Sequence, residues 1–397
     1  MAKLSESSRA MAAIERNHYE RDQKWQAKTV AAAADRYILQ TPNQLSIEIN
    51  DVGYAILTQA NLDLSLEATW DQIVTDYRVA ATRAGMDFYI YACQPSPVNK
   101  DNPVFLISAN STFPDGYTAD NSRNIGGFHC LCVAVGTIGS HTLSNYVAGD
   151  ILPQSVWDEK HRPVSAPAGM VYDSALDKWV DIYLASGTGA STTSVNGGTI
   201  SDTRDWMDFV DDGIAVKKRL LSDIEFQSAA AGSNEETNIT GSVDPVTTTG
   251  HVDTAARRMI SNIGCEDMCG VMYQWLNEQS TRIEGSHTHA QTITHKAVAT
   301  GSAIFKDQAE TTPNAVLGSG ANETITGVAT DIAAWSWYNL PGSKGSLYKQ
   351  GTYGDVKLLA GGSWNAGAGC GSLCRYASHS RWAANTFLGG RFLAEPQ

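Results

Sequence analysis

One segment near the C-terminus gathers side chains that could bind a ligand without covalent chemistry. Between Trp364 and Leu388 the residues are mostly Gly, Ala, Ser, Asn, Cys, His, Tyr and Trp, with two arginines and no carboxylate. Aromatic side chains offer contact area at low entropic cost, while Ser, Asn and Gly offer adaptable hydrogen bonding. This composition is typical of an adaptable binding surface, and a glycine-rich structural loop without a partner is the alternative.

The same segment carries Cys370 and Cys374, so thiol chemistry is a second interpretation. The chain has 7 cysteines, including another CxxxC pair at Cys265 and Cys269. An odd count in a long chain is not typical of a disulfide framework, and CxxxC is not the CxxC spacing of a zinc site. We expect free thiols, with a disulfide joining the CxxxC pairs as the alternative.

An HxH pattern, His287 and His289, provides the candidate metal ligands, with His295 nearby. Paired imidazoles on one strand face the same way and could hold a metal. These histidines lie in a Thr-rich stretch, where exposed histidines are typically solvated. Loop oxygens could bind a structural Ca²⁺, although no EF-hand-like spacing supports it. We therefore predict no cofactor and leave a structural metal open.

Two apolar runs must position the binding segment. Residues 358–364 (LLAGGSW) and 388–393 (LGGRFL) are short and punctuated by glycine, which predicts two strands. A long irregular segment between strands is a loop on a rigid frame, where binding residues tend to sit. We expect Trp364 and Trp382 to pack beneath the surface and Arg391 to be a buried, satisfied arginine.

Other stretches predict the frame. Residues 5–36 are rich in helix formers, which predicts a helix. Residues 87–93 (DFYIYAC) and 124–135 read as strands, and Ser222 with Glu225 predicts a capped helix start. The Thr/Gly/Ala-rich stretches 234–253 and 280–330 lack a core pattern, and we expect surface insertions there.

Bulk composition limits the function classes. A chain of 397 residues with 18% charged residues and 35 glycines predicts two or three β-rich domains. A net charge of -13 without a Lys/Arg cluster argues against nucleic-acid binding. No apolar run approaches the roughly 18 residues of a membrane span, and the N-terminus shows no signal-peptide core. We expect neither membrane insertion nor ordinary secretion.

Several stretches, in order along the chain, resemble one superfamily. The run RLLSDIEFQ (219–227) resembles the helix entry of C-type-lectin-like domains of the formylglycine-generating-enzyme type. GVMYQWLNE (270–278) resembles the strand that follows it. The GGSW start (361–364) and GGRF finish (389–392) resemble the end of the same domain.

Within that superfamily, the chain resembles the major tropism determinants of temperate phages, which are variable proteins of diversity-generating retroelements. The upstream stretches that carry this resemblance are 87–93 (DFYIYAC), 114–129 (PDGYTADNSRNIGGFH), 155–171 and 179–184 (WVDIYL). The resemblance covers roughly residues 86–397. The N-terminal residues do not resemble the family's usual first domain, which leaves the mode of virion attachment open.

The resemblance implies a β-rich α+β fold. Residues 1–85 would be an N-terminal helical and β region for attachment or oligomerisation, and 86–166 a small β-rich domain. Residues 167–397 would form a C-type-lectin-like domain with a variable region at about 361–392.

The implied function is receptor binding at the tip of a phage tail fibre, without enzyme activity. The chain would lie on the virion as a homotrimer beside other tail-fibre proteins. Its partner would be a host cell-surface protein or glycan.

In this family, adenines in the final repeat are mutated, so that AAC codons diversify. Aligned without a gap, the family's diversified positions fall on Ser363, Asn365, Ala366, Gly367, Gly369, Tyr376, Ser378, His379, Ala383, Asn385, Phe387 and Leu388. None carries Trp, Met, Lys, Gln or Glu, which an AAC codon cannot become when only its adenines change. Trp364 and Trp382 fall on fixed positions.

Two alternatives stay open at this point. A bacterial surface adhesin diversified in the same way is the first, and the missing signal peptide argues against it. An oxidase of the formylglycine-generating type is the second, but Cys370 and Cys374 stand in the wrong register for its cysteine pair.

Overall fold

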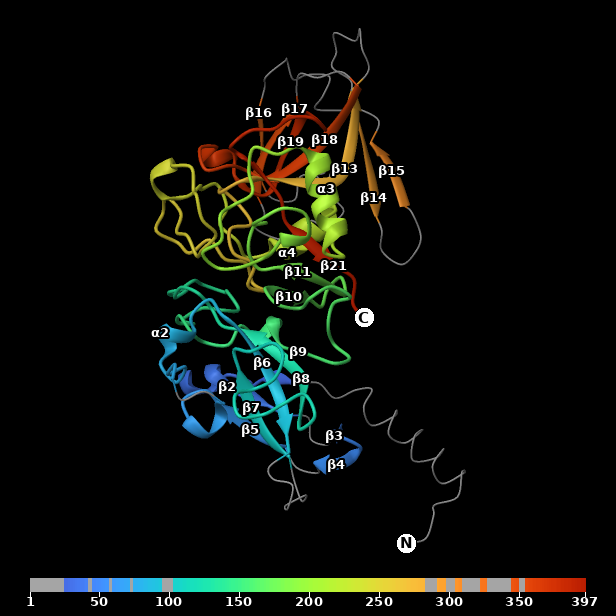
Figure 1. The fold of residues 1–397 in the computed structure, drawn as a ribbon. Coiled ribbons are helices and arrows are strands. Elements are labelled where there is room, and N and C mark those ends of the chain that lie inside the picture. The colour runs from blue at the N-terminus through green and yellow to red at the C-terminus, as the bar shows by residue number, and fades with distance from the viewer. Residues whose placement is uncertain are drawn as a thin grey trace. The chain divides into compact units, whose positions relative to one another are not determined.

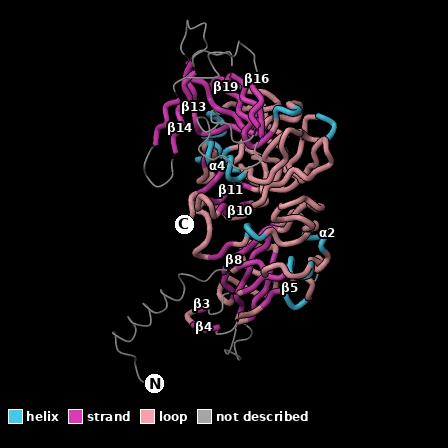
Figure 2. The backbone as a smooth tube through the Cα atoms, turned by 180° about the vertical axis from the view of Figure 1, so that it is seen from behind, coloured by secondary structure: helices cyan, strands magenta, loops and turns pink. Residues whose placement is uncertain are grey.

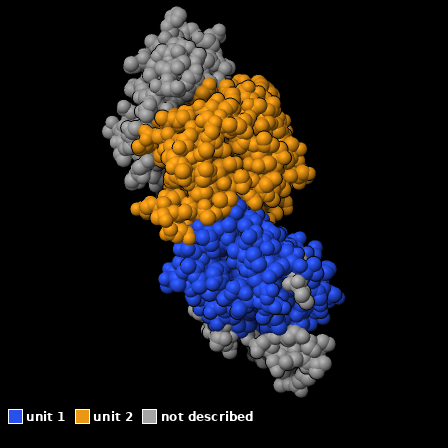
Figure 3. All heavy atoms as spheres, turned by 90° about the vertical axis from the view of Figure 1, so that its left-hand side faces the viewer, with its two compact units in different colours: residues 1–132, 146–162, 397 blue, residues 133–145, 163–396 orange. Residues whose placement is uncertain are grey.

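The computed structural model describes residues 25–41, 45–56, 59–71, 74–94, 103–282, 291–297, 304–308, 322–326, 344–349 and 354–397 (Figure 1). The chain forms two compact units, residues 1–132, 146–162 and 397, and residues 133–145 and 163–396 (Figure 3). Strands and loops predominate over helices (Figure 2). The predicted β-rich α+β class is confirmed. Within the described residues, no helix has the length and apolarity to cross a membrane.

The largest sheet of the first unit is antiparallel, in the order β7-β6-β8-β9, and two smaller sheets have the orders β1-β2-β5 and β3-β4. Its strands are β6 (Asp87–Cys93), β7 (Val104–Ser108), β8 (Ser122–His129) and β9 (Trp157–Asp158). The predicted strand at 87–93 is confirmed, and the one predicted at 124–135 is β8. Smaller elements are β1 (Gln26–Ala27), β2 (Ile38–Gln40), β3 (Leu45–Ile49), β4 (Val52–Ile56), β5 (Asn61–Asp63), η1 (Ala33–Tyr37), η2 (Glu67–Thr69), α2 (Ala80–Arg83) and η3 (Pro153–Ser155).

The helix predicted over residues 5–36 is wrong for its described part. Residues 25–36 hold β1 and the start of η1, while residues 1–24 lie outside the described residues. Trp25 is buried and packs edge-on against Phe105, with ring centroids 5.6 Å apart. The Asp35 carboxylate accepts hydrogen bonds from the backbone N–H groups of Ala31 and Ala32, at 2.9 and 2.7 Å. Tertiary packing and this local turn override helix propensity.

The core of the first unit joins segments far apart in sequence. Trp25, Leu39 and Leu64 share one hydrophobic cluster with Phe88 and Phe128. The boundary expected at 85/86 therefore lies inside one continuous core. The second expected boundary, at 166/167, lies close to residue 163, where the main part of the second unit begins.

The second unit contains two sheets. The smaller has the order β10-β11-β21-β12, and the larger has the order β15-β14-β13-β18-β19-β17-β16, with β20 paired to β13. The strands are β10 (Met170–Asp173), β11 (Lys178–Asp181), β12 (Arg219–Leu220), β13 (Tyr273–Arg282), β14 (Gln291–Ala297), β15 (Ile304–Gln308), β16 (Asn322–Thr326), β17 (Lys344–Lys349), β18 (Gly354–Gly361), β19 (Gly371–Ser380), β20 (Leu388–Gly389) and β21 (Phe392–Ala394). Its helices are η4 (Gly189–Ser191), α3 (Trp206–Ala215), α4 (Asp223–Ala229), η5 (Thr240–Ser242) and η7 (Gly367–Gly369).

Helix α4 begins as the sequence predicts. The Ser222 N–H donates to the Glu225 carboxylate at 2.8 Å, and the Glu225 N–H donates to the Ser222 hydroxyl at 3.4 Å. This reciprocal capping satisfies donors that a helix start leaves unpaired. Arg219 holds the same carboxylate at 2.6 Å, which ties the helix start to β12.

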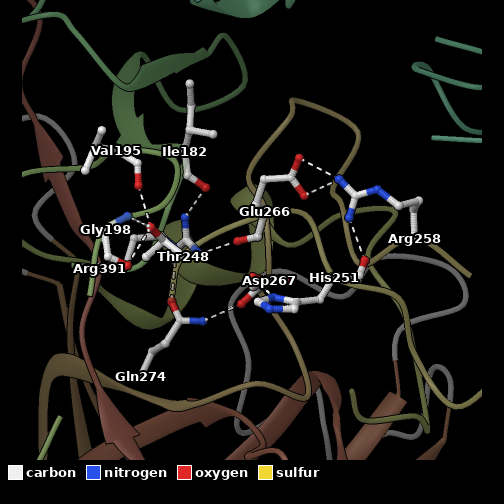
Figure 4. Close-up of polar contacts among 10 residues, drawn as sticks. All are labelled: Ile182, Val195, Gly198, Thr248, His251, Arg258, Glu266, Asp267, Gln274 and Arg391. Carbon is white, nitrogen blue, oxygen red and sulfur yellow. Dashed lines mark hydrogen bonds and ion pairs between the residues drawn. The ribbon is translucent and has the colours of Figure 1, made fainter. Parts of the chain in front are cut away.

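Arg391 joins the two sheets of the second unit through its buried guanidinium (Figure 4). It donates to the Gln274 side chain at 3.0 Å and to the carbonyls of Asp181 and Ile182 at 2.7 and 2.6 Å. A further bond goes to the Glu266 carbonyl. Segments from β11, from β13 and from the loop before β13 thus converge on one side chain. The prediction of a buried, satisfied arginine is confirmed.

Buried ion pairs lie next to the contacts of Arg391. Both carboxylate oxygens of Glu266 lie 2.8 Å from Arg258, and the imidazole of His251 lies 2.7 Å from the Asp267 carboxylate (Figure 4). Gln274 also donates to the Asp267 carbonyl at 3.2 Å. The interior of this unit is held by paired polar groups as well as by apolar packing.

Arg391→Met should destabilise the second unit strongly, since it removes the donor for several buried carbonyls while keeping an unbranched side chain. We expect the free energy of unfolding to fall by about 3–5 kcal/mol in chemical denaturation of the full chain. Lys217→Gln, at an exposed position of the same unit, should change it by less than about 0.5 kcal/mol. Equal effects of the two substitutions would contradict the role assigned to Arg391.

Candidate binding site

Both ends of the candidate segment are held where β13 begins. Val271 forms a parallel bridge with Ser363, and Tyr273 pairs in parallel with Leu388. The Trp364 N–H donates to the Val271 carbonyl at 2.9 Å. The segment therefore leaves and returns at one place beside the start of β13.

The segment is not one irregular loop, which corrects the sequence prediction. Its middle, Gly371–Ser380, is the strand β19, paired antiparallel with β18 and in parallel with β17. Turns flank it, one containing η7 and one over residues 381–387. Strand propensity depends on context, and two flanking strands impose this conformation on a sequence that lacks a strand pattern.

Aromatic side chains of β19 and the second turn form one cluster with β13. The Tyr376 ring lies 5.0 Å from Tyr273 and 5.0 Å from His379 between centroids. His379 is stacked on Phe387, with centroids 5.9 Å apart and planes inclined by 28°. All except Tyr273 are positions that the resemblance predicts to be diversified. Because the rings support one another, they offer a preformed apolar contact area.

Burial lowers the pKa of His379 and so favours its neutral form, and its Nε2 is buried without a hydrogen-bond partner among the described residues. On the neighbouring strand its register partner is Lys357, whose Nζ lies 4.2 Å from the centre of the Trp206 ring.

The first turn, around Trp364 and η7, is held partly by a residue outside the segment. The Asn238 amide donates to the Trp364 carbonyl, and the Ser363 hydroxyl bonds to the Asn365 amide oxygen at 2.8 Å. Gly362 has φ +86, and a Cβ there would lie 2.7 Å from the Cys370 sulfur. The turn thus requires glycine at that position. Trp364 packs partly buried against an apolar cluster, as predicted.

Most of the positions that the resemblance predicts to be diversified lie at the surface. Asn365 is exposed, and the partly exposed positions are Ala366, Gly367, Gly369, Tyr376, His379, Ala383, Asn385 and Phe387. Ser378 lies in β19. Ser363 and Leu388 are buried, which corrects their expected place on the surface. Their backbones pair with the start of β13, and this pairing turns both side chains toward the interior.

Trp382 lies at the surface, which corrects the sequence prediction. It is 67% exposed, although we predict a residue packed beneath the surface. A turn closed by the Ala383 N–H and the Ser380 carbonyl at 3.1 Å places Ala383, rather than Trp382, against the core. The Arg381 guanidinium carbon lies 5.8 Å from the centre of the Trp382 ring. Trp382 therefore adds a fixed aromatic surface beside the diversified positions.

The thiols and histidines form no second site within the described residues. All 7 cysteines are free and buried in the structure, in line with the expectation of free thiols. No group of His, Cys, Asp and Glu in the described ranges has the arrangement of a metal site. The candidate ligands His287 and His289 lie outside those ranges.

A buried carboxylate holds the base of β19. Glu235 accepts hydrogen bonds from the Ser372 N–H at 3.0 Å, the Ser372 hydroxyl at 2.6 Å and the Lys344 N–H at 2.9 Å. Burial raises the pKa of Glu235 to about 7 despite these donors. One side chain from outside the segment thereby fixes the starts of both β17 and β19.

Comparison with known proteins gives the family context. Residues 46–158 match the family model described as the Mtd second domain. Most of the chain is similar to solved structures of the Major Tropism Determinant. The U1, M1 and P3c variants give TM-scores of 0.59, 0.60 and 0.59 at 20%, 20% and 19% identity. Each comparison covers 93% of this chain and 83% of the other. Comparison with curated proteins found no match.

The chain has the Major Tropism Determinant fold. The resemblance seen in the sequence motifs is thus confirmed for the fold, and the matched second-domain segment contains the β7-β6-β8-β9 sheet described above. These comparisons do not test which residues bind a ligand.

Glu235 should make stability depend on pH. The pKa of Glu235 is about 7 in the folded state, above the ordinary value of 4.5. Between these two pH values, the folded state keeps a proton that the unfolded state releases. The contribution of Glu235 to the free energy of unfolding is therefore fully present below pH 4.5 and is lost as the pH rises through about 7. Compared with Glu235→Gln, the natural chain should lose on the order of 2–3 kcal/mol between pH 5 and pH 8.

Thermal melts of both proteins at these pH values measure the difference. Glu236→Gln is the matched control, because it removes the neighbouring carboxylate, which pairs with Lys344 at 2.6 Å. That variant should show the same change of thermal stability with pH as the natural chain. Identical slopes for all proteins would show that Glu235 does not titrate in this range.

Proposed function

We propose that this chain is a receptor-binding protein of the major tropism determinant type, whose segment 361–392 is a diversified binding surface. The observation that supports this most is the placement of the diversified positions. Most are at least partly exposed, and they lie on one segment held at both ends by β13. Several of the similar structures are named as variants of one determinant, in keeping with a surface that changes on a constant fold.

The proposed surface has the physical properties of a paratope. Tyr376, His379 and Phe387 provide preformed aromatic area, while Asn365 and Asn385 provide hydrogen-bonding groups at the surface. Rigid aromatics contribute contact area with little loss of entropy, and small polar groups adapt to different partners. The same backbone can therefore serve many ligands as the side chains change.

We infer that residues 167–397 form a C-type-lectin-like domain and that 86–166 and 1–85 serve presentation and attachment. The partner would be a host cell-surface protein or glycan, bound by a homotrimer at the tip of a tail fibre on the virion. Three linked sites on a repetitive surface would bind far more firmly than one. A diversified bacterial surface adhesin is the second candidate for the same surface.

A catalytic role is not part of the proposal. An oxidase of the formylglycine-generating type would need reactive cysteines in this segment. Cys370 is buried, and burial raises the pKa of its thiol far above the ordinary range. The thiolate is the reactive form of cysteine, so this environment favours an inert, protonated thiol.

Sequences of sibling copies of the encoding element test the diversification directly. Substitutions should concentrate at the diversified positions and spare Trp364, Trp382 and Arg391. Because Ser363 and Leu388 are buried, sibling residues should stay small at the first and apolar at the second. The Gly/Ser/Thr-rich stretch 185–201 is the matched control and should show no excess. An invariant segment 361–392 would contradict the proposal.

A further inference from the structure

Residues that lead into α3 hold the second turn of the segment, residues 381–387, from outside the segment. The Thr203 N–H donates to the Asn385 carbonyl at 3.1 Å, and the Trp206 N–H donates to the Arg381 carbonyl at 3.1 Å. One bond thus falls near each end of the turn. Both acceptors are backbone carbonyls, which every residue carries, so these contacts do not depend on the side chains in the turn.

The start of α3 has a donor to spare for this purpose. Trp206 is the first residue of the helix, and the first N–H groups of a helix have no acceptor within it. A reciprocal cap satisfies two neighbouring donors, since the Asp208 N–H bonds to the Asp205 carboxylate at 3.0 Å and the Asp205 N–H to the Asp208 carboxylate at 3.1 Å. The Trp206 N–H is left for the Arg381 carbonyl.

The Trp206 side chain ties this helix start to the large sheet. Its indole N–H donates to the Leu276 carbonyl at 2.9 Å. Leu276 lies in β13 between Trp275 and Gln279, where the register with β18 shifts. Such an irregularity interrupts the ladder, so a carbonyl there needs a donor from elsewhere. Through its two N–H groups, Trp206 therefore joins the second turn to β13.

The Trp206 ring also contacts the strand beside β19. The Nζ of Lys357 in β18 lies 4.2 Å from the centre of this ring, and Lys357 is the register partner of His379. Trp206 packs against the same buried cluster as Ala383 and Phe387 of the second turn. One side chain outside the segment thus contacts the sheet on which the candidate surface is built at two strands.

We propose that Trp206 is a positioning residue that fixes the backbone of the second turn, and with it Ala383, Asn385 and Phe387, before a ligand binds. The consequence for binding rests on the proposed function, because it concerns the same surface. A turn held in one conformation loses less conformational entropy when a ligand docks. Because the holding contacts come from Trp206 and Thr203, side chains in the turn can change while its backbone stays in place.

Hydrogen exchange of the full chain, measured by mass spectrometry, tests the positioning role without a ligand. Trp206→Phe removes the indole bond and keeps an aromatic ring. We expect the backbone N–H groups of Ala383 and Leu388, which are bonded within the turn, to exchange about fivefold faster. Trp206→Ala, which also removes the ring, should raise this to about tenfold or more. The first turn, residues 363–370, should exchange as in the natural chain.

Val210→Ala is the matched control. Val210 lies on the same helix and packs against the same buried cluster, so this substitution removes apolar packing without touching the indole bond. It should leave exchange in both turns unchanged. Equal acceleration in both turns of the Trp206 variants would show an ordinary core residue and overturn the inference, as would unchanged exchange in the second turn.

Binding is measured on clones of the full chain that are randomised at the positions expected to diversify and selected on lysozyme as a probe protein. Trp206→Phe should lower their affinity about fivefold, because binding must then order the turn, and Val210→Ala should not. Faster exchange with unchanged affinity would overturn the role of Trp206 in binding. Failure to select any clone would overturn the proposed function alone, since the exchange measurement decides by itself whether Trp206 positions the turn.

Discussion

The pairing of both ends of the diversified segment with the start of β13 is the constraint on which the proposed surface depends. Val271 and Tyr273 are two residues apart in one chain, and they hold Ser363 and Leu388. Ser363 and Leu388 are buried as part of this pairing, and β19 between them belongs to the same sheet. Most of the other positions expected to diversify are exposed or partly exposed, so the sheet holds the segment while these positions could meet a ligand.

The polar interior reinforces that separation. Arg391, directly before β21, is anchored by a carbonyl of β11 and by one from the loop before β13, and Glu235 anchors the starts of β17 and β19 from outside the segment. Breaking a buried polar contact costs free energy whichever residues occupy the surface. These two polar anchors involve no side chain at a position expected to be diversified, which suits a surface that varies.

Local signals were predictable from the sequence, and long-range pairing was not. The Ser222–Glu225 cap, the strand at 87–93 and the buried Arg391 each carry their signal within a few residues. The sequence of strand β19 carries no such local signal. Its conformation comes from pairing with β18 and β17. The exposure of Trp382 has a related cause. Aromatic character predicts burial, but the turn closed by the Ser380 carbonyl decides which way the side chain points. The placement of most diversified positions at the surface came only through the resemblance, not from periodicity.

A surface that varies needs some contact that does not, because each new combination of side chains must still exclude water from a partner. Under the proposed diversification, an AAC-derived codon would not supply tryptophan or methionine, two of the side chains enriched in protein interfaces. Trp382, which falls outside the expected diversified positions and is 67% exposed, would then supply an aromatic face shared by every version of the surface. Such a constant contact would provide affinity with little selectivity, and the variable polar and aromatic residues would decide which partner is bound.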